Sequence, residues 1–155
     1  MSSLLDRLRY IIEDIRGEKT YAESQRDKYK KIVSGLQEQL GKTNYLDDVM
    51  EQLKNDYDIM EVNPDSAQGK LSTTFVTKET ENRQAVEALG ANLKLAISEV
   101  KRKLEFAQGE QEYWCREAKR EDREMKIYQQ QYYAEEERIR REEAERRARE
   151  QQAYK

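Results

Sequence analysis

The sequence contains no histidine, one cysteine and one proline among its 155 residues. Without histidine, the chain lacks the side chain that most often acts as a general base near neutral pH and that commonly binds zinc. A single cysteine, Cys115, excludes an intrachain disulfide and every zinc site that requires several thiolates. Glycine-rich phosphate-binding loops are also missing. These absences predict a protein that is not an enzyme and that uses no cofactor and no metal ion.

Apolar residues are scarce as well. Hydrophobic residues make up 36% of the chain and charged residues 39%, and the mean hydropathy is −1.17. Ordinary globular domains are about 45–50% apolar and about 25% charged. Such a chain cannot surround a compact core, but long helices that bury one narrow stripe need far fewer apolar residues. Because one proline and six glycines argue against both a disordered linker and a turn-rich β fold, the predicted fold class is all-α.

Neither the charge nor the hydropathy pattern points to nucleic acid or to a membrane. Lysine and arginine total 29 against 32 acidic residues, and the resulting net charge of −3 provides no field for binding phosphates. No apolar run approaches the roughly 18 residues of a membrane span. The start of the chain, Met1-Ser2-Ser3, lacks the apolar core of a signal peptide. We therefore expect a cytoplasmic protein, with export by a route that needs no cleaved signal left open.

Apolar residues recur at alternating steps of three and four between residues 5 and 40. This spacing is the heptad pattern of a coiled coil, in which positions a and d face a partner helix. Two a positions in the middle of the series hold Lys19 and Arg26. Cations in such a seam need partners, from Gln111, from nearby carboxylates or from another chain.

Residues 41–44, with the sequence Gly-Lys-Thr-Asn, interrupt the heptad series. Leu46, Met50 and Leu53 follow in a different phase, which indicates a kink or a local overwinding of the helix. We expect one helix over about residues 4–60 with a break near residues 41–44.

Pro64 ends this first helix, because proline has no amide donor and disfavours helix in the preceding residue. A turn over residues 62–71 and a second helix from about residue 72 are expected to follow. The apolar stripe of this second helix fades after residue 133. Residues 1–133 are therefore predicted to form one helical hairpin.

The last segment, residues 134–155, consists mainly of glutamate and arginine. Several Glu/Arg pairs stand four positions apart with the acid first, an arrangement that stabilises a helix by about 0.2–0.5 kcal/mol per pair. The segment is expected to be a helical or frayed tail that overhangs the hairpin.

Two long helices joined by a short turn predict an elongated, antiparallel two-helix hairpin that resembles a coiled coil. A turn centred near Ser66 would place residue i opposite about residue 132 − i and bring Trp114 beside Gly17. The seam between the two helices is expected to contain Leu8, Ile15, Tyr29, Leu36, Leu93, Leu104 and Trp114.

The apolar stripes are wider in places than a single partner helix requires. A broad apolar face is typical of helices with more than one neighbour. We therefore expect a bundle of four or more helices, formed with another helical protein or with a second copy of the chain. The residues expected to bind this partner are Leu4, Ile11, Ile32, Ala88, Leu95 and Ala96.

The segment from Asp65 to Phe75, with the sequence Asp-Ser-Ala-Gln-Gly-Lys-Leu-Ser-Thr-Thr-Phe, joins the turn to the second helix. It resembles the turn of the small helical-hairpin proteins of type VII secretion, the WXG-like superfamily, and more narrowly of the accessory proteins encoded beside LXG-type toxins. The Trp-x-Gly turn of the wider family is absent. The family also carries a Tyr-x-x-x-Asp/Glu export signal beyond its hairpin, and candidates here are the pairs Tyr132/Glu136 and Tyr133/Glu137.

The resemblance implies a non-enzymatic role for the chain. Proteins of this kind bind the helical N-terminal domain of a toxin and help to present a composite signal to the secretion machine. The residues alone leave an alternative open, namely a coiled-coil assembly or scaffold protein such as a component of a flagellar or type III export stalk.

Overall fold

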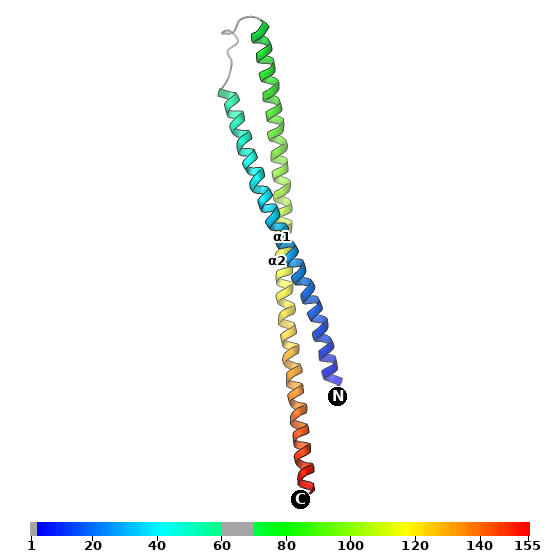
Figure 1. Cartoon of the computed structure of the whole chain (residues 1–155). Helices are drawn as coiled ribbons and strands as arrows, with labels where there is room; N and C mark the ends of the chain where they lie inside the picture. Colours follow the sequence, from blue (N-terminus) through cyan, green and yellow to red (C-terminus); the bar gives the residue numbers. More distant parts are fainter. Residues whose placement is uncertain (1–2, 60–69) are drawn as a thin grey trace. The chain divides into compact units, whose positions relative to one another are not determined.

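The structure is a computed structural model that describes the backbone of residues 3–59 and 70–155 and the side chains of residues 3–56 and 78–155. The backbone forms two α-helices, α1 (Ser3–Ile59) and α2 (Lys70–Ala153), as Figure 1 shows. No strand occurs in these two ranges. The predicted all-α helical hairpin is confirmed.

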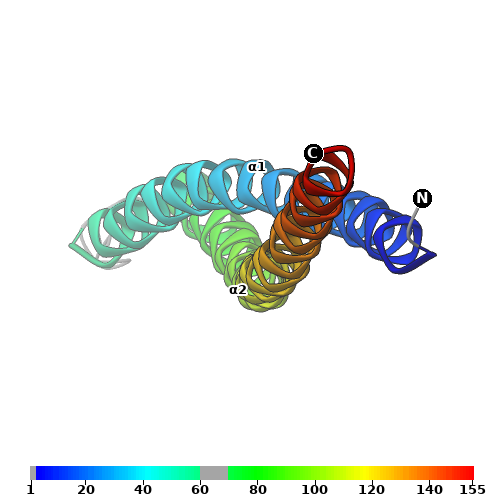
Figure 2. The same ribbon diagram turned by 90° about the horizontal axis from the view of Figure 1, so that it is seen from below.

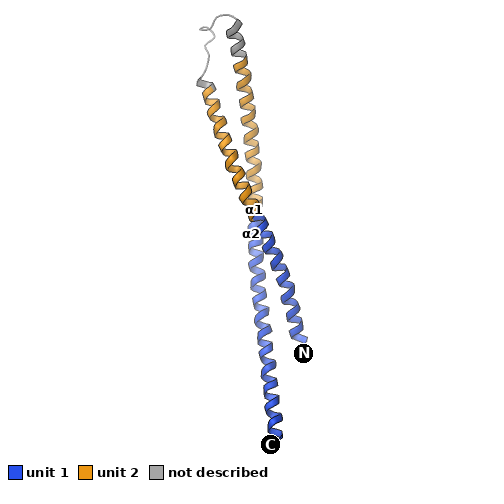
Figure 3. Ribbon diagram, viewed as in Figure 1, with its two compact units in different colours: residues 1–29, 109–155 blue, residues 30–108 orange. Residues whose placement is uncertain are grey.

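The chain divides into two units, shown in Figure 3. Unit 1 contains residues 1–29 and 109–155, and unit 2 contains residues 30–108. Each unit therefore contains a segment of α1 and a segment of α2. Within unit 1 the two segments are antiparallel, because Arg9 contacts Tyr132 whereas Lys19, further along α1, contacts the earlier residue Asp122.

The break expected near residues 41–44 is absent, and the prediction must be corrected to a continuous helix. The backbone of α1 is helical throughout this segment, and its ribbon is uninterrupted in both views (Figure 1, Figure 2). A glycine inside a helix costs only about 1 kcal/mol relative to alanine, which is too little to end a helix that is stabilised on both sides. The hydroxyl of Thr43 also bonds inside the helix, donating to the Gln39 carbonyl at 2.6 Å.

The heptad phase of α1 does not change after this segment either. Leu40, Thr43, Asp47 and Met50 are all half-buried, so the alternating steps of three and four continue unchanged. Leu46 and Leu53 are exposed instead. Reading only apolar residues gave a false phase, because polar side chains occupy two of the inward positions.

The core of unit 1 is a thin layer between the two helix segments. Ile12, Ile15 and Met125 form its buried cluster, with Ile11, Tyr128 and Tyr132 packed against them. Unit 2 has an equally narrow core, made of Val33, Ile97, Val100 and Ala107. All of these buried residues lie at heptad positions, which explains how so few apolar residues hold the helices in place.

The seam of unit 1 extends beyond residue 133, where the hairpin was expected to end. Glu135 is buried and Ile139 is half-buried, whereas every residue from 140 to 155 is exposed. The segment after 133 continues α2 to Ala153 and forms no separate element.

The register explains this longer seam. Two contacts define the register: Arg9 bonds to Tyr132, and Lys19 bonds to Asp122. Residue i of α1 in unit 1 therefore lies opposite about residue 141 − i of α2. The expected value was 132 − i, from a turn assumed to be symmetric about Ser66. The packing of Ile12 and Ile15 on Met125 sets the register here, because large apolar side chains gain more from meeting one another than the chain gains from a symmetric turn.

Replacing Gly41 with alanine should raise the free energy of unfolding by about 0.5–1 kcal/mol, because glycine loses more backbone entropy in a helix than alanine does. A Cβ atom added at Gly41 meets nothing within 4 Å, so no clash offsets this gain. Urea unfolding followed by circular dichroism at 222 nm measures the change. A lower stability in the alanine variant would mean that the backbone at residue 41 is not helical.

Candidate functional site

The structure places the seven expected seam residues toward the interior of their units. Leu8 and Ile15 are buried. The others are half-buried, namely Tyr29, Leu36, Leu93, Leu104 and Trp114.

The six residues expected to bind a partner divide into two groups. Ile11 is half-buried against the Ile12/Ile15/Met125 cluster, so it completes the core of unit 1 and does not present a free face. The other five are exposed, namely Leu4, Ile32, Ala88, Leu95 and Ala96. Leu4 belongs to unit 1 and the other four to unit 2.

Sequence reasoning missed a further set of exposed apolar side chains in unit 2. Leu46, Val49 and Leu53 are 52%, 44% and 39% exposed and follow one another on α1 at steps of three and four. This spacing puts them on one face of the helix. We call these three residues the α1 stripe. The false heptad phase after residue 44 hid the stripe, because it assigned Leu46 and Leu53 to the interior.

The two candidate export pairs lie in different surroundings. Tyr132 packs on the core cluster, and its hydroxyl accepts a hydrogen bond from Arg9 Nη2 at 3.2 Å. Glu136 is half-buried. Tyr133 and Glu137 are both exposed, and Glu137 pairs with Arg141 at 2.8 Å. Only the Tyr133/Glu137 pair therefore points outward.

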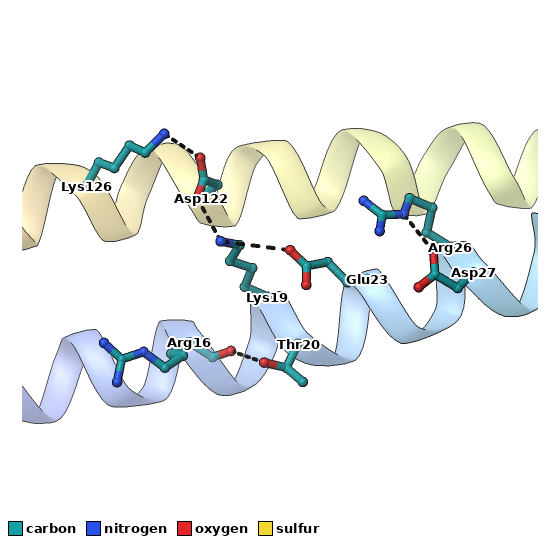
Figure 4. A network of polar contacts seen from close by, with 8 residues as sticks. All are labelled: Arg16, Lys19, Thr20, Glu23, Arg26, Asp27, Asp122 and Lys126. Carbon is teal, nitrogen blue, oxygen red and sulfur yellow. Dashed lines mark hydrogen bonds and ion pairs between the residues drawn. The ribbon is translucent and has the colours of Figure 1, made fainter.

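Lys19, the first cation in the seam, finds its partners within unit 1 (Figure 4). Its Nζ donates to Asp122 Oδ1 at 2.8 Å and lies 3.8 Å from Glu23 Oε1, while Lys126 Nζ lies 2.8 Å from Asp122 Oδ2. The hydrogen bonds from Lys126 and Lys19 lower the pKa of Asp122 to about 2. The Lys19 cation therefore needs no second chain to balance it.

Arg26, the second seam cation, donates from Nε to Oδ1 of its neighbour Asp27 at 3.1 Å (Figure 4). Both expected partner requirements are thus met by nearby carboxylates. The seam charges give no independent reason to expect another chain.

A pocket of about 620 Å³ lies between the two helix segments of unit 1. Five carboxylates and one guanidinium contribute to its wall, together with two aromatic rings. The lining residues are Glu13, Asp14, Gly17, Glu18, Tyr21, Ala22, Trp114, Glu117, Arg120 and Glu121. We call this the Trp114 pocket.

The aromatic side of the pocket is an edge-to-face cluster around Trp114. The Tyr21 and Tyr113 rings lie 5.5 Å and 5.0 Å from the Trp114 ring, with interplanar angles of 86° and 80°. The Trp114 Nε1–H group is buried and has no hydrogen-bond partner among the described residues. Gly17 leaves room nearby, because a Cβ atom at that position would meet nothing within 4 Å. Trp114 and Gly17 line the same pocket, but the register of 141 − i places Gly17 opposite about residue 124 and not opposite Trp114.

Among the carboxylates that line the pocket, Glu121 alone is buried. It is only 4% exposed and occupies a seam position between the buried residues Ala118 and Met125. Arg120 Nη2 donates to its Oε1 at 2.9 Å, but its buried Oε2 has no hydrogen-bond partner in the described part of the chain. Burial, followed by the nearby Glu18 carboxylate, raises the pKa of Glu121. A charged group in this position destabilises the fold unless something else compensates it.

The described residues contain no group of three histidine, cysteine, aspartate or glutamate side chains placed to hold a metal ion. Within the same residues, neither helix has a stretch long and apolar enough to cross a membrane. No protein-family model, no curated protein and no solved structure matches this chain.

Proposed function

We propose that this chain is a non-enzymatic interaction protein that adds its helices to a helical partner. The observation that supports this proposal is the α1 stripe, three exposed apolar side chains on one face of a unit whose own core is narrow. Exposed apolar side chains that gather on one face are typical of interaction sites. A partner helix that packs on this face would extend the seam into a bundle.

The stripe can contribute substantially to such a complex, but it is not sufficient alone. Complete burial of one Leu or Val side chain is worth roughly 1.5–3 kcal/mol, and about half of each stripe residue is still exposed. Association itself costs about 4–15 kcal/mol. Unit 2 also exposes Ile32, Leu89, Leu95 and Phe106, which are a source of additional apolar contact.

The more specific proposal is a targeting factor that binds the helical N-terminal domain of an LXG-type toxin for type VII secretion. Its support is the resemblance of the Asp65–Phe75 segment, of which residues 65–69 lie outside the described residues. The outward-facing Tyr133/Glu137 pair is accessible to a secretion receptor. With such a partner, the chain would act in the cytoplasm and would be exported with its toxin or remain behind.

A coiled-coil scaffold, such as a component of a flagellar or type III export stalk, is the second candidate. The observation in its favour is the internal pairing of Lys19 and Arg26, which gives unit 1 a seam whose cations need no other chain. A stalk protein would act on an export ATPase ring, whereas a toxin partner would bind one cognate helical domain.

Co-expression with the helical N-terminal domain of a toxin encoded beside this chain tests the proposal. The double variant Leu46→Lys/Leu53→Lys should weaken the complex at least tenfold, because two lysines would have to be buried in the interface. The matched control is Asn44→Lys/Gln52→Lys, which adds the same charge to exposed polar positions of the same helix segment. Isothermal titration calorimetry of the purified components measures the difference. Equal affinity of the two double variants would refute the role of the stripe, and lack of any complex would favour the scaffold.

A further inference from the structure

The inward-facing positions of α2 near Trp114 depart from the coiled-coil rule at one residue. Ala118 and Met125 are buried and apolar, as the rule requires, but Glu121 between them is a buried carboxylate. Its Oε2 atom has no partner in the described residues and belongs to a side chain that lines the Trp114 pocket. Departures from the local pattern are expected at functional or strained sites.

The pocket has more negative charge than the chain itself neutralises. Arg120, the only cation in its wall, donates to Glu117 at 2.7 Å and to Glu121 at 2.9 Å. Glu13 is near enough to Arg9 for their charges to attract, whereas Asp14 and Glu18 have no cationic group within 4.0 Å among the described residues. Glu18 and Glu121 moreover repel each other. An additional positive group in the pocket would remove this repulsion and neutralise part of the excess charge.

The remaining wall fits an organic cation. Aromatic rings attract cations through the negative face of the ring, and carboxylates bind a guanidinium through paired hydrogen bonds. Arginine combines both interactions better than lysine, because its guanidinium is planar and less strongly hydrated. A bare metal ion is a poorer fit, since no three acidic side chains of the described residues converge on one point.

We propose that the Trp114 pocket binds the guanidinium group of an arginine side chain presented by a helix of a partner protein. The surplus of carboxylates selects for positive charge, and the open space beside Gly17 admits the side chain. The site belongs to unit 1 and uses none of the α1 stripe residues of unit 2. This inference rests on the proposed function in one respect: the arginine is carried by a helix of the partner protein.

The test uses the full chain and a helical, alanine-rich peptide with acetylated and amidated ends and arginines four positions apart. A second peptide carries citrulline, the neutral isostere, in place of arginine. Trp114 is the only tryptophan of the chain, so its emission reports on this pocket directly. The arginine peptide should give a saturable change in emission with an apparent Kd at least tenfold lower than that of the citrulline peptide. Equal affinities for the two peptides would overturn the proposal.

Two variants separate the pocket from nonspecific charge. Glu18→Gln/Glu121→Gln should weaken binding of the arginine peptide at least tenfold, whereas Glu143→Gln/Glu150→Gln, which removes the same charge from the exposed tail, should change it less than twofold. Calorimetry repeats the titration without relying on fluorescence, and circular dichroism verifies the fold. If both double variants bind like the original chain, the site is not this pocket.

Arginine amide, the free small cation, completes the experiment. It should bind at least tenfold more weakly than the arginine peptide, because it lacks the contacts of the helix. Binding of the amide as tight as that of the peptide would overturn the assignment to a partner helix. A toxin domain that fails to bind the chain would leave these peptide results unaffected, so the two proposals can fail separately.

Discussion

Replacing Ile15 with alanine is expected to lower the free energy of unfolding of unit 1 by about 2–4 kcal/mol. Ile15 is 6% exposed and is one of three buried side chains in the cluster with Ile12 and Met125. Because the core of this unit is a single thin layer, no second layer can collapse into the space that the side chain leaves. Urea unfolding followed by Trp114 emission reports on the same unit.

The matched control is Ile127→Ala, at a position of α2 that is 54% exposed and belongs to the same unit. This substitution should change stability by less than about 0.5 kcal/mol, because little burial is lost and alanine favours helix more than isoleucine does. Similar losses at the two positions would mean that the Ile12/Ile15/Met125 cluster does not hold the segments together.

Replacing Glu121 with leucine is expected to stabilise the protein by about 1–3 kcal/mol at pH 7. The substitution exchanges a buried carboxylate with an unpartnered oxygen for an apolar side chain at an inward-facing heptad position. Thermal unfolding followed by circular dichroism measures the gain. The same variant should lose the affinity for the arginine peptide, so stability and binding would change in opposite directions.

The effect of Glu121 on stability should depend on pH. Its pKa in the folded protein is raised above its ordinary value of 4.5, so the folded state binds a proton more readily than the unfolded chain does. The stability contributed by Glu121 therefore falls as pH rises from 4.5 through the raised pKa. Glu121→Gln should be more stable than the original chain at pH 7, and this difference should shrink toward zero below pH 4.5. A difference that stays constant from pH 7 to pH 4 would show that charge at this position is not the cause.

Much of the fold could be predicted from spacing alone. The heptad series between residues 5 and 40 assigned the inward side of α1 correctly, and the scarcity of proline and glycine correctly predicted long helices. Both inferences depend on local chemistry, because helix periodicity and backbone preference are properties of neighbouring residues.

The same reasoning failed where inward positions are polar. Thr43 and Asp47 continue the seam of α1. A pattern search that accepts only apolar residues cannot follow a seam through such side chains. It therefore assigned Leu46 and Leu53 to the interior.

The amino-acid sequence by itself determined that this protein is made of long amphipathic helices with narrow apolar stripes. Local spacing and composition decide where a helix forms, which of its faces turns inward and what charge it carries. Only the tertiary structure decided which α2 residues meet which α1 residues, because register depends on how distant side chains such as Ile15 and Met125 pack together. That register brings Glu18 and Glu121 near each other, in the pocket that Trp114 also lines. The acidic pocket exists only because side chains from two helices, about a hundred residues apart in the sequence, face the same space.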